Sequence, residues 1–363
     1  MLRRLAPYLQ QIGLVVILVA MALTVAGLGG ERTVTRSVDG ELRTFRVNAL
    51  FNPEQLLTLA TSTSFIAIMA VGATLVIASG GIDLSIGAVY ALAASAGALV
   101  LKALGPAGAG WSEGTAVAAG VAACLAVGVG AGAVNGCLVV ALRVHPFIIT
   151  LGTMAIFRGI AFLATGGQAV TNFPPLLQHL VKWDLGGGLY PVPLLVMLAV
   201  AGLAALYLRR TVPGIYVFAV GGNETAARYS GLPVNKVKIS VYTIAGGTGG
   251  LAAVLLLGYY GGASSDAGFG YELNVIAAAV IGGASLLGGR GGAVGALLGA
   301  LLIQLIDTSI TILNIDQNYS LVILGFVVIV AVLLDQSIAA LARRLALAPA
   351  EAQGAALTPG GNP

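Results

Sequence analysis

The sequence predicts an all-α, polytopic integral membrane protein. Of its 363 residues, 58% are hydrophobic and only 9% are charged, whereas a soluble domain usually carries about 25% charged residues. The apolar residues also fall in runs close to the roughly 20 residues that a helix needs to cross a bilayer. The net charge of +4 does not indicate nucleic-acid binding, because the basic residues gather at the ends of apolar runs.

Ten apolar runs are predicted to span the lipid bilayer. The first follows Arg3 and Arg4 and has an apolar core of about 17 residues, longer than that of a cleaved signal peptide, so we expect an uncleaved helix. The runs at 86–102 and 272–288 fit the pattern least well. In order, the ten are 11–28, 55–78, 86–102, 115–142, 147–164, 191–208, 239–258, 272–288, 291–308 and 319–336.

The distribution of basic residues predicts that both termini are cytoplasmic. With this orientation the cytoplasmic side holds Arg3, Arg4, Arg143, Arg209, Arg210, Arg228, Lys236, Lys238, Arg290, Arg343 and Arg344. The loop 29–54 weakens the bias, because it places four arginines outside. We expect a single membrane domain over 1–345 and a disordered cytoplasmic tail over 346–363, which is rich in alanine, glycine and proline.

A polar segment at 209–238 interrupts the apolar pattern and predicts a short helix. Asn223 is a good N-cap residue, and Glu224 then lies in the first turn, where the helix dipole favours an anion. Gly231 suits the left-handed position after the helix, and Pro233 prevents its continuation. A helix of about two turns is unstable alone. It must be supported by the rest of the chain or by a partner.

Several polar residues fall within the apolar runs, where a charge is costly. Two interpretations of Asp83 remain open: it caps a helix start, or the break at SGGIDLS (79–85) lines a pathway. Arg158 either snorkels or pairs with a carboxylate, or lines the same route. A pathway lined by such residues would suit a neutral sugar. The candidate lining residues are Asp83, Ser85, Asn135 and Arg158, together with Gln304, Asp307 and Thr308 on one helical face.

Regularly spaced glycines predict close helix packing. Small residues four apart occur at Gly128, Gly132 and Gly136, at Gly246 and Gly250, and at Gly291, Gly295 and Gly299, and this spacing lets helix backbones approach in lipid. Sliding surfaces or a dimer seam are the alternative. A faint internal resemblance also joins 77–95 with 281–300, because both run from an apolar segment through a glycine pair into a small-residue helix.

The chain carries no motif of catalysis or metal binding. It has no G-x-x-x-x-G-K-[ST], HExxH or G-x-S-x-G sequence. Cys124 and Cys137 lie about 20 Å apart on one helix, too far for a disulfide. We therefore expect no catalytic residue, no metal and no enzyme activity. Uphill transport would need an ion gradient or a separate ATPase.

Taken together, several motifs resemble the permease subunits of ribose-type sugar importers of the ATP-binding-cassette (ABC) class. They cover about 55–336 in order: SGGIDLSIG (79–87), Asn135-Gly136, PFIITLGTM (146–154) with Arg158-Gly159, AVGGN (219–223), and YEL (271–273) through VIGG (280–283) to GGRG (288–291).

This resemblance implies a bacterial inner-membrane permease for a ribose-, xylose- or galactose-like monosaccharide, paired with a second copy or a homologue. It also implies cytoplasmic ATPase subunits that bind the ATP, so the chain itself needs no cofactor, and an extracytoplasmic sugar-binding protein. The segment that couples to the ATPase would comprise Gly222, Asn223, Glu224, Ala227, Arg228, Ser230 and Gly231. The loop 29–50 is longer and richer in arginine than this family leads us to expect, which suggests a docking role.

Three other functions remain open. The first is a related ABC permease for branched-chain amino acids. The second is an ion-coupled secondary carrier, which the scarcity of carboxylates near mid-membrane disfavours. The third is a membrane scaffold, which the polar face with Gln304 and Asp307 disfavours. The sequence does not name the sugar or distinguish a homodimer from a heterodimer.

Overall fold

In the computed structural model, the described residues are 2–38, 41–186, 190–327, 329–330 and 333. The predicted tail at 346–363, with Arg343 and Arg344, lies outside them. The predicted span at 319–336 lies only partly inside them.

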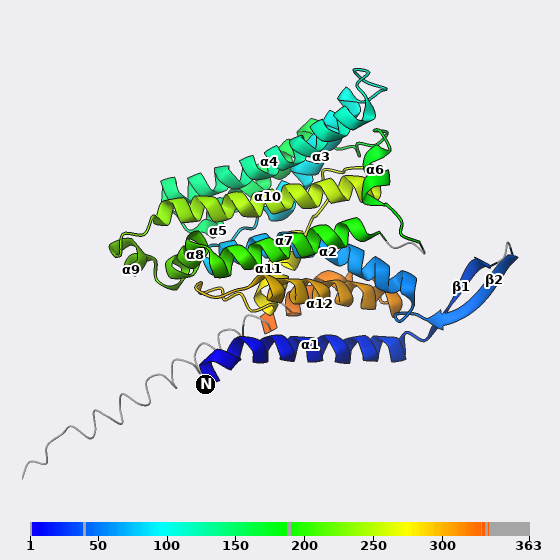
Figure 1. Ribbon diagram of the computed structural model, residues 1–363, viewed down its shortest axis with the longest axis horizontal. Coiled ribbons are helices and arrows are strands. Elements are labelled where there is room, and N and C mark those ends of the chain that lie inside the picture. The colour runs from blue at the N-terminus through cyan, green and yellow to red at the C-terminus, as the bar shows by residue number, and fades with distance from the viewer. Residues whose placement is uncertain (1, 39–40, 187–189, 328, 331–332, 334–363) are drawn as a thin grey trace, which may run out of the picture.

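The described helices form one bundle, which confirms the predicted all-α polytopic fold (Figure 1). Eight of them are long and apolar enough to cross a membrane. These are α1 (Leu2–Leu28), α2 (Pro53–Ala78), α3 (Ile86–Leu104), α4 (Glu113–Leu142), α5 (Pro146–Thr165), α7 (Pro191–Arg210), α10 (Val234–Tyr260) and α12 (Ala293–Ile312). The shorter helices are α6 (Leu176–Val181), α8 (Val212–Gly222), α9 (Glu224–Tyr229) and α11 (Tyr271–Ile281).

The prediction that 272–288 spans the membrane is wrong. Helix α11 has only 11 residues and ends at Ile281. Gly282 and Gly283 then begin a turn in which Gly283 takes a positive φ of 101°, a conformation that glycine adopts without a steric penalty. The apolar residues after this turn extend the hydropathy signal, but they do not extend the helix.

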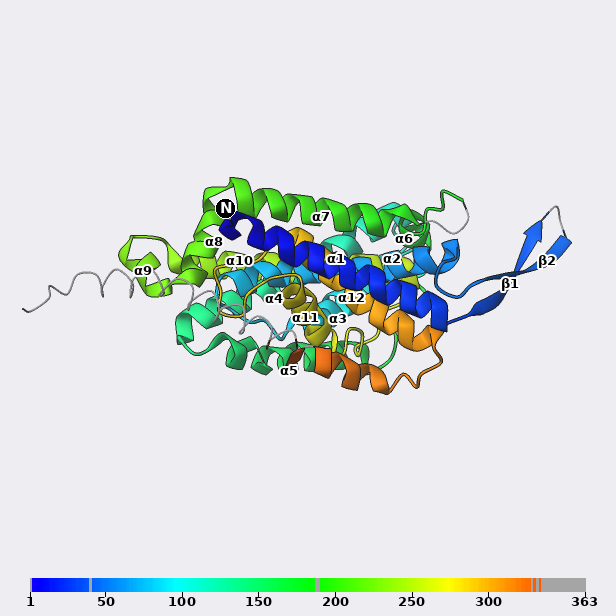
Figure 2. The ribbon, with the colours of Figure 1, turned by 90° about the horizontal axis from the view of Figure 1, so that it is seen from below.

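The bundle has two distinct ends. Helices α8 and α9 and the start of α1 lie at one end, which we call the α9 end (Figures 1 and 2). A hairpin of β1 (Glu31–Val38) and β2 (Glu41–Asn48) projects from the opposite end. The start of α1 lies at the α9 end (Figure 2). Because the N-terminus is predicted to be cytoplasmic, the α9 end is the predicted cytoplasmic end of the bundle.

The hairpin is a feature that the sequence analysis missed. Its strands are antiparallel, with Glu31 opposite Asn48 and Arg36 opposite Arg43. The run of threonines and valines in β1 suits a strand. Asn48 anchors the hairpin to the bundle, because its Nδ2 donates to Ala26 O at 2.9 Å and its Oδ1 accepts from Phe51 N at 2.8 Å.

The spaced glycines join helices within the chain, as the close-packing prediction requires. A Cβ atom on Gly128 would lie 2.5 Å from Gly246 O, and one on Gly250 would lie 2.6 Å from Cys124 O. At Gly136, the added atom would lie 2.7 Å from Ile239 Cα. Helices α4 and α10 therefore touch backbone to backbone at successive levels.

The two segments of the faint internal resemblance have similar local structure. Each has a helix, a turn containing a glycine pair and a second helix, namely α2 with α3 and α11 with α12. The two turns meet, because Gly289 N donates to Ala78 O at 2.9 Å.

Candidate functional site

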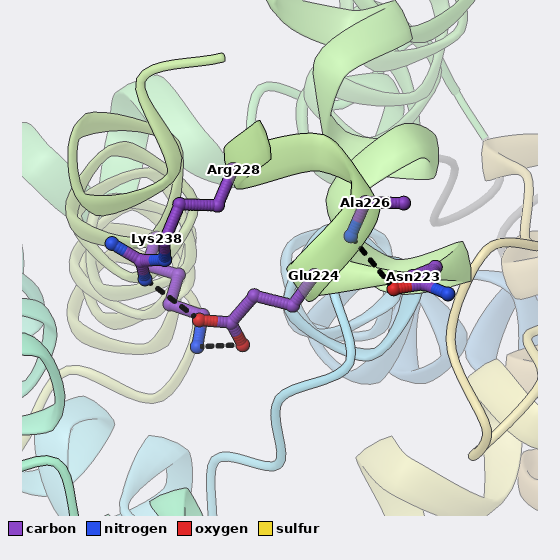
Figure 3. Close-up of polar contacts among 5 residues, drawn as sticks. All are labelled: Asn223, Glu224, Ala226, Arg228 and Lys238. Atoms are coloured by element: carbon purple, nitrogen blue, oxygen red, sulfur yellow. Dashed lines mark hydrogen bonds and ion pairs between the residues drawn. The ribbon is translucent and has the colours of Figure 1, made fainter. Parts of the chain in front are cut away.

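The short helix α9 is capped at both ends by the residues that the sequence indicated. Asn223 has an extended conformation, and its Oδ1 accepts from Ala226 N at 2.9 Å (Figure 3). At the other end Gly231 has a positive φ of 78°, and its N–H donates to Arg228 O at 3.1 Å. Leu232 N donates to Ala227 O at the same distance, which completes a Schellman motif.

The chain itself supports α9 on one side. Ala227 is buried, with 5% of its surface exposed. Glu224 uses both carboxylate oxygens: Oε1 lies 3.0 Å from an Arg228 guanidinium nitrogen and Oε2 lies 2.6 Å from Lys238 Nζ (Figure 3). Because Lys238 belongs to α10, the second contact ties α9 to a long helix. The opposite side of α9 is free, since Tyr229 is 88% exposed.

The charges around Glu224 also set its protonation. Burial raises the pKa of the Glu224 carboxyl, but the hydrogen bonds and positive charges of Lys238 and Arg228 outweigh this effect and lower the pKa below its usual value. The carboxylate therefore remains ionised under ordinary conditions.

Helix α8, which leads into α9, rests on a glycine junction formed by Gly221, Gly288, Gly289 and the Ala78–Gly80 turn. A Cβ atom on Gly221 would collide with Ala78 O and would lie 2.7 Å from Gly289 N. Gly288 and Gly289 both have positive φ, 81° and 74°. The junction places the end of α8, from which the chain continues into α9, against the turn after α2 and the turn after α11.

Three of the pathway candidates meet in one buried cluster. Asp83 Oδ1 accepts from Ser85 N at 2.8 Å and from Ser85 Oγ at 2.7 Å, and Asn135 Nδ2 donates to Ser85 Oγ at 2.7 Å. All three residues are buried. Asp83 Oδ2 and Asn135 Oδ1 have no hydrogen-bond partner among the described residues.

The helix break at 79–85 is present, and its local bonds differ from a simple cap. Ser85 is the N-cap of α3, yet its side chain makes no capping bond to the helix. Asp83 instead holds the backbone and the hydroxyl of Ser85. Tyr242 supports the break, because its hydroxyl donates to Ile82 O at 3.1 Å. Thr150 Oγ1 accepts from Leu84 N at 3.3 Å.

Arg158 donates hydrogen bonds to backbone carbonyl groups. It therefore fits neither of the two predicted structural roles, snorkelling or pairing with a carboxylate. Its guanidinium donates to Ser265 O at 2.9 Å and to Ala267 O at 2.7 Å, with a longer contact of 3.4 Å to Gly268 O. These carbonyls belong to the turn that precedes α11. Arg158 therefore anchors the start of this half-length helix to α5.

The candidates on α12 form a third group. Asp307 Oδ1 accepts from Ser320 Oγ at 2.8 Å, and Thr308 is buried. Gln304 is partly exposed on the same helix. No hydrogen bond recorded among the described residues joins this group to Asp83 or to Arg158.

Several residues of these groups were not predicted from the sequence. Lys238 was considered only as a basic flank, and Tyr242 and Thr150 were not singled out. Glu272 was part of a motif but was not a site candidate, although its Oε2 is buried without a partner among the described residues. It lies against α3, where a Cβ atom on Gly87 would come within 2.6 Å of this oxygen. A charged residue at the start of an apolar run was the available signal.

Comparison with known proteins identifies similar chains. Residues 55–332 match the family model described as branched-chain amino acid transport system / permease component. The ribose import permease protein of Escherichia coli K12 is 40% identical over 294 residues, which cover 80% of this chain and 86% of the relative. The D-allose transport system permease protein of the same organism is 36% identical, with coverage of 79% and 86%.

A third relative has a different printed substrate. The autoinducer 2 import system permease protein of Photorhabdus laumondii is 33% identical over 292 residues, with coverage of 77% and 84%. The family match includes the buried cluster, α9 and the glycine junction. Helix α1 and the hairpin precede it.

Proposed function

Because the chain belongs to the family of branched-chain amino acid transport system permease components, we propose that it is the membrane subunit of an ABC importer for a monosaccharide such as ribose, xylose or galactose. As a member of this permease family it is a multi-pass protein of the bacterial inner membrane. It is a transport subunit and carries no ATPase motif of its own.

The exposed helix α9 is the observation that carries this proposal. A six-residue helix is too short to be stable by itself, yet α9 is capped at both ends and fixed to α10 by Glu224 and Lys238. Its outer side, with Tyr229, remains free for a partner. We assign this partner as a cytoplasmic ATPase subunit, which binds the ATP, and the chain itself needs no cofactor.

The internal contacts suggest how α9 transmits force. When the ATPase displaces α9, the bond from Glu224 to Lys238 pulls on α10, and the glycine junction moves the turns that follow α2 and α11. The helices that begin at those turns, α3 and α12, carry pathway candidates or contact them. Alternating access would follow from their displacement in a pair of permeases, either two copies of this chain or this chain with a homologue.

The solute is proposed from two lines of support. Relatives with 36–40% identity are named for ribose and D-allose. In addition, Asp83 Oδ2, Asn135 Oδ1 and Glu272 Oε2 are hydrogen-bond acceptors without a protein donor among the described residues, and sugar hydroxyls are donors. An extracytoplasmic binding protein would deliver the sugar. A branched-chain amino acid is the second candidate solute, because the family description names it.

Transport assays distinguish these functions. The full chain is reconstituted in liposomes with an ATPase subunit and a sugar-binding protein from the same genome, and uptake of labelled ribose and leucine is compared. We expect ATP-dependent uptake of the monosaccharide. Uptake of leucine alone would favour the amino-acid permease. Uptake by this chain alone, driven by a sodium or proton gradient, would establish an ion-coupled carrier and refute the proposal.

A further inference from the structure

The α9 end of the bundle contains a groove, and most of the residues that line it take no part in the proposed coupling contact. Its volume is about 540 Å³. It lies between the end of α4, the start of α5, helix α9 and the start of α10, and it is lined by Val139, Val140, Arg143, Val144, Pro146, Glu224, Arg228, Asn235 and Lys238.

The groove carries more positive than negative charge. It contains three cationic side chains, Arg143, Arg228 and Lys238, but only one carboxylate, Glu224. Arg228 and Lys238 share that carboxylate. Arg143 has no ion pair or side-chain hydrogen bond among the described residues. The groove is therefore suited to an anion, with Arg143 as the cation that is free to bind it.

Arg143 lies where α4 ends and the chain turns toward α5. Arg143 ends α4 in the left-handed conformation, with φ 54° and ψ 27°. Glycine or asparagine fits this position with less strain. Arg143 occupies this position, and its side chain lines the groove.

The other wall of the groove is apolar and continues onto the outer surface of the bundle. Val139, Val140, Val144 and Pro146 form this wall. Next to it, Leu142, Ile148 and Leu151 are exposed, with 55%, 58% and 46% of their surfaces accessible. Ile148 and Leu151 are three residues apart on α5 and share one face. A ligand that joins an anionic group to an apolar chain fits both walls.

From these observations we propose that the groove binds the phosphodiester headgroup of an anionic phospholipid, whose acyl chains lie along α5. Basic pockets between membrane helices at the cytoplasmic side recognise such headgroups. The phosphate contacts Arg143, Arg228 and Lys238, and competes with Glu224 for the last two. The lipid would thereby adjust how firmly α9 is held to α10.

The test uses the full chain purified in detergent, without partners, so its outcome does not depend on the transport function. The probe is dihexanoyl phosphatidylglycerol, and binding is measured by native mass spectrometry. Each basic residue contributes about 1 kcal/mol to attraction of an anionic lipid, or about fivefold in affinity. We expect Arg143→Gln to weaken binding about fivefold. Lys236→Gln changes a basic residue in the first turn of α10 that does not line the groove; it serves as the control and should leave binding within about twofold.

Three results would overturn the proposal. Equal binding of dihexanoyl phosphatidylcholine would show that the headgroup charge is irrelevant. Displacement of the lipid by inorganic phosphate at equal concentration would show a free-phosphate site. Equal losses in Arg143→Gln and Lys236→Gln would show diffuse surface attraction. Should Arg143→Gln lower the melting temperature without lipid, Val144→Glu provides a second variant, which adds a carboxylate to the groove and must also weaken binding.

Discussion

Lys238 Nζ lies 2.6 Å from Glu224 Oε2, although the two residues are 14 positions apart in the sequence, and this contact joins the short helix α9 to the first turns of α10. The same carboxylate holds Arg228 within α9. One side chain therefore fixes both the internal geometry of α9 and its attachment to the bundle.

Loss of this carboxylate should uncouple the transporter without unfolding it. Glu224→Gln removes two charge pairs that are partly exposed, and such pairs contribute little stability, about 0–1 kcal/mol. We expect a melting temperature close to that of the parent chain but a several-fold drop in sugar-stimulated ATPase activity of the assembled complex. Glu113→Gln, at the opposite end of the bundle, is the control. Unchanged ATPase stimulation in Glu224→Gln would contradict a coupling role for the contact between Glu224 and Lys238.

The effect of pH on the contact between Glu224 and Lys238 follows from the lowered pKa of Glu224. A group with a lowered folded-state pKa contributes stability that is present above its unfolded-state pKa and is lost as the pH falls through the folded-state value. The contact between Glu224 and Lys238 should therefore persist at all pH values above the usual pKa range of a carboxyl group. The ratio of ATPase stimulation between Glu224→Gln and the parent chain should be the same at pH 6 and pH 8. A ratio that changes between these values would mean that another group titrates.

The buried cluster predicts a contrast between two substitutions of Asp83. In Asp83→Asn the amide oxygen still accepts from Ser85, and the amide N–H₂ supplies a donor in a cluster where Asn135 Oδ1 has none among the described residues. Stability should be retained or increased. Asp83→Ala removes both bonds from Ser85 and should destabilise the chain by about 1–3 kcal/mol. Thermal unfolding in detergent measures both. Equal losses would show that the cluster requires a negative charge.

The glycine junction predicts a contrast between neighbouring glycines. A methyl group on Gly221 would collide with the Ala78 carbonyl, whereas one on Gly222 meets no atom within 4 Å. Overpacking of this kind costs about 1–3 kcal/mol. Gly221→Ala should lower the melting temperature of the isolated chain, and Gly222→Ala should leave it nearly unchanged. Equal behaviour of the two variants would indicate that α8 does not rest on the turn after α2.

Arg158 predicts a graded series. Arg158→Ala leaves Ser265 O and Ala267 O without their donor and should cost about 1–3 kcal/mol for each carbonyl that stays buried. Arg158→Lys keeps the charge but lacks the planar guanidinium that reaches several acceptors, so it should fall between the alanine variant and the parent chain. Thermal unfolding orders the three chains. A lysine variant as stable as the parent would show that charge alone is sufficient.

Local signals in the sequence predicted much of this structure. Asn223 and Gly231 indicated the caps of α9 because a cap depends only on nearby backbone groups. The runs of apolar residues likewise indicated most long helices. The prediction failed at 272–288, because hydropathy does not register that Gly282 and Gly283 end α11.

Contacts between distant residues could not be predicted in the same way. Arg158 binds carbonyls 107 to 110 residues away, and backbone carbonyls carry no residue-specific signal. The partner of Glu224 on α10 lies beyond a turn whose geometry the sequence does not specify. The hairpin at 31–48 was missed because its strands are shorter and more polar than the runs sought for membrane spans.

The backbone contact between α4 and α10 restricts how this protein can move. With no side chains between Gly128 and Gly246 or between Gly250 and Cys124, a slide along the helix axis would push bulkier residues into spaces that accommodate only a hydrogen atom. We therefore expect α4 and α10 to move together as one rigid unit. A change in which side of the membrane the pathway opens to must then come from hinges elsewhere. The two glycine turns that meet at Ala78 and Gly289 are the places where the chain can bend relative to this unit.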